Sequence, residues 1–215
     1  MARQVRAEQT RSTIIKAAAE MFDRYGYRAT SLSDIVAHAG VTKGALYFHF
    51  SSKEDLAKAV VQEQHSLWMS QAQSFAELRI PALEALIRMS YGLATQLRSH
   101  PVIRGGIRLT LENGTFEVPM PDPYLDWISL SVQLLEQATS ELDVRTNVEL
   151  DRVAQFIVSS FTGIHLVAQV LDDRRDVVER VADMWRIILP GLVLSRKLSY
   201  YLGFLTSASK ELREA

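Results

Sequence analysis

The chain has 215 residues, a formal net charge of −1 and no cysteine. This length suits one or two domains with a substantial buried core. The lack of cysteine excludes disulfides, thiolate nucleophiles and cysteine-ligated metal sites. Residues 1–60 contain nine lysines and arginines against six acids, so this part carries +3 and the remainder −4. The basic part suits contact with phosphate, although ordinary fluctuation in composition explains the difference equally well.

The first predicted helix runs from about Arg6 to Tyr25, and Gly26 ends it. Its apolar stripe consists of Ile14, Ile15, Ala18, Met21 and Phe22. The basic residues at the N-terminus are Arg3, Arg6 and Arg11. They favour two interpretations equally: a flexible arm that reaches the DNA backbone or minor groove, or a solvated tail.

Residues 31–53 predict two short helices joined by a tight turn. The apolar face of the first is formed by Leu32, Ile35, Val36 and Ala39. Ser31 is a suitable N-cap, and Gly40 suits the left-handed conformation after the helix. Val41 is expected to fill the junction, and Thr42 to cap the second helix. A helix-turn-helix has this plan, with the start of its second helix facing DNA.

The start of this second helix provides the candidate DNA contacts. Lys43 is the best candidate for a base contact, against the alternative of a solvated surface lysine. Gly44 allows the backbone to approach a phosphate, and the Thr42 hydroxyl can touch one as well. Tyr47 follows one turn later, where its ring can pack while its hydroxyl reaches a phosphate oxygen.

The residues after this turn have less certain roles. We expect Phe48 and Phe50 in the core, and His49 near the DNA backbone. Lys53 begins the next helix, where backbone N–H groups and the helix dipole attract phosphate, so it is a candidate phosphate contact.

The rest of the chain is helical in pattern, without convincing period-2 alternation. Helices are expected at residues 53–78, 81–98, 101–112, 122–142, 148–171 and 175–195, and a last one is possible at 200–215. Pro190 is expected to kink or divide its helix. Residues 112–123 form the one predicted loop. The uncharged span 153–171 contains too many polar residues for a lipid-facing helix, so we expect it buried and expect no membrane association.

Enzymatic interpretations find little support in the sequence. No two of the five histidines have the spacing of a zinc protease, and there is no nucleophile elbow, dinucleotide fingerprint or P-loop. We therefore expect no enzyme, no metal and no cofactor.

The helix-turn-helix also carries a family resemblance. Residues 41–56, VTKGALYFHFSSKEDL, resemble the DNA-binding signature of the TetR family of bacterial repressors, and residues 10–40 resemble the rest of its N-terminal domain. The N-terminal MARQVRAEQTR, and Trp127 behind the proline-rich loop, resemble the γ-butyrolactone or butenolide autoregulator receptors of Streptomyces within that family. The resemblance supports a basic N-terminal arm.

The same resemblance implies the ligand site. Trp127 corresponds to a tryptophan that lines the pocket of the autoregulator receptors, and Thr162 to a residue that hydrogen-bonds the ligand's lactone. Gln64 is a plausible second polar anchor among apolar walls. Val158 and Phe161 lie on the same helix rows as Thr162. Core packing is favoured for these two, and they are kept as candidates for the pocket wall.

The sequence thus predicts an all-α, two-domain, ligand-responsive repressor. Residues 1–52 form a three-helix DNA-binding domain, and residues 53–215 a larger helical domain for ligand binding and dimerisation. We expect a cytoplasmic homodimer, paired through the last two long helices, that binds a pseudo-palindromic operator and is released by a small hydrophobic lactone. The alternatives are a repressor that responds to another hydrophobic ligand and a DNA-binding protein without a small-molecule effector.

Overall fold

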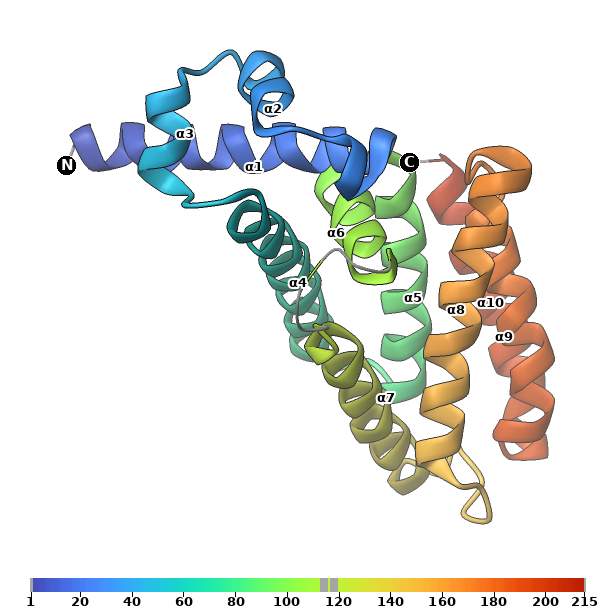
Figure 1. The fold of residues 1–215 in the computed structure, drawn as a ribbon. Helices are drawn as coiled ribbons and strands as arrows, with labels where there is room; N and C mark the ends of the chain where they lie inside the picture. The colour runs from blue at the N-terminus through green and yellow to red at the C-terminus, as the bar shows by residue number, and fades with distance from the viewer. Residues whose placement is uncertain (1, 113–115, 117–119, 215) are drawn as a thin grey trace. The chain divides into compact units, whose positions relative to one another are not determined.

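The computed structural model describes residues 2–112, 116 and 120–214 and contains ten α-helices within them (Figure 1). They are α1 Ala2–Ala29, α2 Leu32–Ala39, α3 Lys43–His49, α4 Lys53–Glu77, α5 Ala82–Ser99, α6 Pro101–Leu111, α7 Asp122–Ser140, α8 Leu150–Asp172, α9 Val177–Leu192 and α10 Ser195–Glu214. The described residues form no strand beyond one isolated β-bridge between Val144 and Val193. The prediction of an all-α fold is confirmed.

The helices are divided between two compact units. The head unit consists of Met1–Met69 and Ser99–Pro121, and the body unit of Ser70–Arg98 and Asp122–Ala215. The chain therefore passes between the units within α4, at the end of α5 and before α7. The functional division expected after residue 52 stays a prediction.

The core of the head unit is built from one face of each of its helices. Ile14, Ala18 and Phe22 of α1 are fully buried, as the predicted stripe required. They pack with Ile35 of α2, Leu46 of α3, Leu56 and Val60 of α4, and Val102 and Leu109 of α6. Gly26, with φ 80° and ψ 170°, interrupts the helical conformation of α1 where the sequence predicted its end.

Local capping defines the helix-turn-helix. Ser31 accepts a hydrogen bond from the N–H of Asp34, whose carboxylate accepts one from the N–H of Ser31, so the two form a capping box. Gly40 ends α2 at φ 64°, in the left-handed region. Val41 is half-buried against the core, and Thr42 caps α3. All four sequence predictions for this motif are confirmed.

The body unit is held by buried polar contacts as well as apolar packing. The fully buried Trp185 of α9 donates from Nε1 to Ser90 Oγ of α5 at 2.8 Å. Asp143 accepts from the Tyr201 hydroxyl and pairs with the Lys197 ammonium, each at 2.6 Å. The last helix foreseen near the C-terminus is thus well packed, and it begins at Ser195, earlier than expected.

The prediction for Pro190 needs refinement, because α9 continues through it to Leu192. A proline lacks an N–H donor and crowds the preceding turn, which destabilises a continuing helix. Here the proline lies in the last turn of α9, and α10 begins three residues after Leu192. The proline therefore stands close to the end of a helix and does not divide one at its middle.

The helix α8 is, among the residues that the structure describes, the one whose length and composition would allow it to cross a membrane. One face of it, with Ala154, Ile157, Phe161 and Ala168, is buried in the body unit. This packing fits the expected buried helix better than a lipid-facing one.

Candidate DNA-binding surface and ligand site

The start of α3 is placed by the Thr42 cap. The Thr42 hydroxyl accepts a hydrogen bond from the N–H of Ala45 at 3.1 Å, which fixes the first turn of the helix. Lys43 and Gly44 lie in this turn and are exposed. The side chain and the backbone that were predicted to meet DNA are therefore accessible on one short, capped helix.

The aromatic residues of α3 divide between core and surface. Leu46 and Phe50, one turn apart, are buried, so the prediction for Phe50 is confirmed. Phe48 is 77% exposed and Tyr47 58% exposed. The prediction of a buried Phe48 is wrong. In a helix of seven residues packed along a single face, a residue two positions from Leu46 points away from the core.

His49 lies between two phenylalanine rings at the end of α3. Its ring centroid is 5.0 Å from that of Phe48 and 6.2 Å from that of Phe50, and the residue is half-buried. The Arg11 guanidinium of α1 lies over the Phe50 ring at 5.5 Å. Arg11 is thereby tied to the end of the recognition helix.

The N-terminal arginines do not form an extended arm in this structure. The helix α1 already begins at Ala2, and Arg6 is an exposed residue on it. The Arg6 carbonyl accepts a hydrogen bond from the hydroxyl of Thr10, four residues later, at 2.9 Å. In place of a flexible arm or a disordered tail, the structure has the helix α1 from Ala2 onward, and Arg6 and Arg11 lie on it. A contact of Arg6 with DNA stays a prediction.

Lys53 makes contacts that the sequence did not suggest. Its ammonium donates to the carbonyls of Tyr27 at 3.0 Å and Thr30 at 3.1 Å, and lies 4.2 Å from the centre of the Tyr27 ring. An ammonium has three donors, so one remains for a phosphate. The phosphate contact of Lys53 stays a prediction. In the head unit, its ammonium also holds the segment from Tyr27 to Thr30.

The body unit brings together the candidates for the pocket wall. Trp127 of α7 is 8% exposed, and its ring meets the Phe161 ring edge-on, with centroids 5.0 Å apart and planes at 77°. Val158 and Phe161 of α8 are buried, as the core interpretation expected. The Thr162 hydroxyl donates to the Val158 carbonyl at 2.9 Å and keeps its acceptor capacity for another partner.

Gln64 belongs to the head unit, whereas Trp127 and Thr162 belong to the body unit. Gln64 is 7% exposed, and a Cβ added to Gly106 of α6 would lie 2.6 Å from Gln64 Cβ. Gln64 is therefore packed closely against α6. That Gln64, Trp127 and Thr162 face one cavity stays a prediction.

His165 is a buried histidine one turn beyond Phe161, and we expect it to make the protein sensitive to acid. Burial and the charge of Arg174 lower the pKa of His165 from its ordinary 6.5 to about 4. Between pH 6.5 and about pH 4, His165 is protonated in the unfolded chain but neutral in the folded protein. The free energy of unfolding therefore falls as the pH falls, by at most about 1.4 kcal/mol per pH unit.

The measurement is the free energy of unfolding of wild type and His165→Gln at pH 7, 6 and 5. The wild type should lose stability more steeply across this range than the variant. Parallel curves would mean that folding does not lower the pKa of His165.

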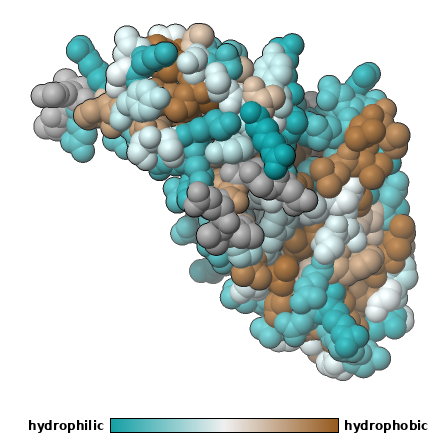
Figure 2. Space-filling view, in the orientation of Figure 1, coloured by the Kyte–Doolittle hydropathy of each residue, from teal (hydrophilic) through white to brown (hydrophobic). Residues whose placement is uncertain are grey.

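Two features of the surface and the head unit escaped the sequence analysis. The first is a groove of about 530 Å³ between α8 and α9, whose apolar lining includes Phe156, Val167 and Ile187. Figure 2 shows hydrophobic surface gathered over these helices. Exposed apolar residues at helical spacing on α8 were the available signal, but spacing alone cannot show which face is outside.

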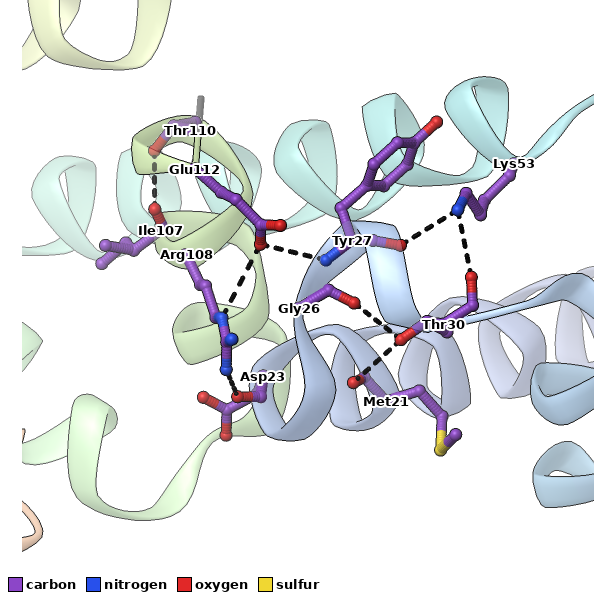
Figure 3. A network of polar contacts seen from close by, with 10 residues as sticks. All are labelled: Met21, Asp23, Gly26, Tyr27, Thr30, Lys53, Ile107, Arg108, Thr110 and Glu112. Atoms are coloured by element: carbon purple, nitrogen blue, oxygen red, sulfur yellow. Dashed lines mark hydrogen bonds and ion pairs between the residues drawn. The ribbon is translucent and has the colours of Figure 1, made fainter. Parts of the chain in front are cut away.

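The second feature is a polar network in the head unit (Figure 3). Glu112 accepts a hydrogen bond from the N–H of Tyr27 at 3.0 Å. In addition to the residues drawn there, Arg104 of α6 pairs with Asp23 of α1 at 2.6 Å. The arginines of α6, at positions 104 and 108, flank a pair of glycines, a pattern that indicates close helix packing but does not identify the partner.

The comparisons with known proteins agree with this geometry. The model of "Bacterial regulatory proteins, tetR family" matches residues 14–60, and that of "Tetracyclin repressor-like, C-terminal domain" matches residues 80–194. The A-factor receptor protein of Streptomyces griseus is 41% identical over 192 residues, which cover 89% of this chain and 67% of that protein.

Solved structures are similar along almost the whole chain. A γ-butyrolactone receptor described as ArpA-like is 40% identical, with a TM-score of 0.85 and coverage of 96% of this chain and 99% of that one. The TetR-family protein CprB of Streptomyces coelicolor, in complex with its biological operator sequence, is 39% identical, with a TM-score of 0.85 and coverage of 95% and 98%.

The fold and the exposed recognition helix define a helix-turn-helix transcriptional regulator. The chain belongs to the TetR family of bacterial regulatory proteins, and its relatives include γ-butyrolactone receptors.

Proposed function

We propose that this protein is a cytoplasmic repressor that binds a pseudo-palindromic operator as a homodimer and is released from it by a small lactone-type ligand. The observation that carries the proposal is similarity over 96% of the chain, head and body units alike, to a γ-butyrolactone receptor. Similarity confined to the head unit would support DNA binding alone. Similarity that extends through the body unit supports a shared kind of ligand.

The DNA-binding part of the proposal assigns roles to the accessible groups of the head unit. Lys43 reads base edges, and Gly44 allows close approach of the backbone. The phosphate contacts are assigned to Arg6, Thr42, Tyr47, His49 and Lys53. A dimer must place its two recognition helices about 34–36 Å apart, one turn of DNA, or somewhat more where the DNA is overwound or bent.

Lys43→Ala is expected to weaken specific operator binding by about 1–3 kcal/mol and to relax discrimination at one or two base pairs. The cause is the loss of a side chain that contacts base edges. Affinities for the operator and for single-base variants of it, measured by fluorescence anisotropy, give the result. Lys58→Ala, which removes another exposed lysine of the head unit, is the matched control. Equal operator affinity for Lys43→Ala and wild type would remove Lys43 from base recognition.

Lys53→Ala should instead weaken binding to all sequences about evenly, because a phosphate contact carries no sequence information. The slope of log affinity against log salt concentration should also fall by about one unit. Anisotropy titrations at several salt concentrations, on operator and on unrelated DNA, measure both effects. An unchanged slope would argue that the third donor of Lys53 does not meet a phosphate.

The ligand part of the proposal places Trp127, Val158 and Phe161 in the apolar wall of a pocket, with Thr162 and Gln64 as its hydrogen-bonding groups. An aromatic wall and a few polar groups suit a lactone with an alkyl tail. Titration of a synthetic γ-butyrolactone, followed by tryptophan fluorescence in wild type and Trp127→Phe, tests this directly. A saturable change that depends on Trp127 is expected.

Two alternative functions predict different responses to small molecules. A TetR-type repressor with a different hydrophobic ligand would leave the fluorescence unchanged with lactones and change it with another compound. A DNA-binding protein without an effector would respond to no small molecule. Similarity along almost the whole chain to a γ-butyrolactone receptor favours the lactone.

A further inference from the structure

The backbone of Tyr27 is held on both sides (Figure 3). Its N–H donates to Glu112 Oε2 at 3.0 Å, and its carbonyl accepts from the Lys53 ammonium at 3.0 Å. Both bonds involve a charged partner, which makes them stronger than bonds between neutral groups. Two distant residues, 59 positions apart in the sequence, thus meet at the backbone of one residue.

These contacts lie at the entrance and the exit of the helix-turn-helix. Tyr27 and Thr30 lie four residues and one residue before the Ser31 cap of α2. Lys53 begins α4, four residues after α3 ends at His49. Because Lys53 also donates to the Thr30 carbonyl at 3.1 Å, it joins the segment before α2 to the segment after α3. The helix-turn-helix is therefore closed at its base by Lys53.

Glu112 brings α6 into the same arrangement. Arg108, one turn earlier on α6, lies 3.8 Å from the Glu112 carboxylate and donates to the carbonyl of Asp23. A Cβ added to Gly26 would lie 2.9 Å from both Arg108 Nη2 and Glu112 Oε2, and one added to Gly105 would lie 2.5 Å from the carbonyl oxygen of Ala19. The two glycines make room for α6, which places the Glu112 carboxylate at Tyr27.

We propose that Glu112 and Lys53 are positioning residues for operator binding, and that they act as a pair through the backbone of Tyr27. Glu112 holds its N–H and Lys53 holds its carbonyl, and together they fix the base of the helix-turn-helix that presents Lys43. Loss of Glu112 would leave α3 folded but less well oriented, and loss of Lys53 would add this effect to the loss of the proposed phosphate contact. The proposal rests on operator binding by the head unit.

The first test compares Glu112→Ala with Glu112→Gln by fluorescence anisotropy on a duplex that the wild type selects from random-sequence DNA. Alanine removes a negative charge, so simple electrostatics predicts equal or tighter DNA binding. The proposal predicts the opposite sign, a loss of about tenfold, because a partly buried N–H loses its partner. Glutamine keeps an acceptor oxygen and should stay within about twofold of wild type.

The control is Glu149→Ala, which removes an exposed glutamate paired with Arg152, three residues along its own chain. Stoichiometric titration gives the fraction of each preparation that binds DNA. If Glu112→Ala lowers only this fraction, or binds as tightly as wild type, or if glutamine behaves like alanine, the proposal is overturned.

The second test is a double-mutant cycle with Lys53→Met, which keeps the side-chain stem and removes the ammonium. If both residues act through the backbone of Tyr27, Lys53→Met should cost at least about threefold less affinity in the Glu112→Ala background than in the wild type. Additive losses would show that Lys53 acts independently of Glu112. Failure of the wild type to bind any selected duplex would instead refute the proposed function itself, and this inference with it.

Discussion

Ile187→Glu is expected to convert the protein to a monomer and to abolish operator binding. Ile187 is 77% exposed on α9 and lines the groove with Phe156, which is 57% exposed on α8. A contiguous apolar groove on the two helices expected to form the dimer interface suits burial against a second copy. In a two-fold symmetric interface the substitution would place two unpaired carboxylates in an apolar contact, at a high desolvation cost.

Sedimentation velocity at micromolar concentration measures the effect on assembly, and anisotropy measures the effect on operator binding. Leu125→Glu is the matched control, since Leu125 is 56% exposed on α7, outside the groove. The control should remain a dimer with wild-type affinity. A dimeric Ile187→Glu protein, or a monomeric wild type, would show that this groove is not the dimer interface.

Trp127→Ala is expected to leave operator binding intact and to abolish release by the lactone. The large ring covers Phe161, and in the proposed function it also covers the ligand. Removing a contact made only in the ligand-bound state affects release and leaves the ligand-free state unchanged. Paired anisotropy titrations with and without a synthetic γ-butyrolactone measure the effect.

Truncation of a buried tryptophan costs about 3–5 kcal/mol of stability, so thermal unfolding accompanies this experiment. Trp127→Phe keeps an aromatic ring against Phe161 and should retain partial release. If Trp127→Ala fails to fold, Trp127 is a core residue, and the Phe variant decides whether it also meets the ligand. A folded Trp127→Ala protein that still releases on lactone would place the ligand elsewhere.

The helix-turn-helix was predictable because its signals are local. The Ser31 and Asp34 capping box, the left-handed Gly40 and the Thr42 cap all act within three residues of the backbone they fix. Local hydrogen bonding of this kind depends little on the rest of the fold. The sequence therefore specified the helix ends and the exposed position of Lys43.

The polar network of the head unit was not predictable in the same way. Tyr27 and Glu112 lie 85 residues apart, and their contact requires the close packing of α6 on α1. Phe48 was assigned to the core from its apolar character, although α3 has only one buried face. Apolar character alone is a weak guide to burial in a short helix with one buried face.

The candidate ligand-binding residues were predictable only in part. The contact between Trp127 and Phe161 agrees with the family resemblance. Their role in a pocket depends on a ligand, and so does the role of Thr162, whose hydroxyl already bonds its own helix. Physical pattern alone favoured core packing for Val158 and Phe161, and their burial fits both interpretations.

The central claim, release from DNA by a lactone, is tested most directly by one titration. A fluorescent duplex selected by the wild-type protein is saturated with protein, and a synthetic γ-butyrolactone with an alkyl side chain is added while anisotropy is followed. The account predicts that anisotropy falls toward the value of free DNA, because operator affinity is reduced by about 5–150-fold at saturating lactone. Unchanged operator affinity at every lactone concentration would contradict it.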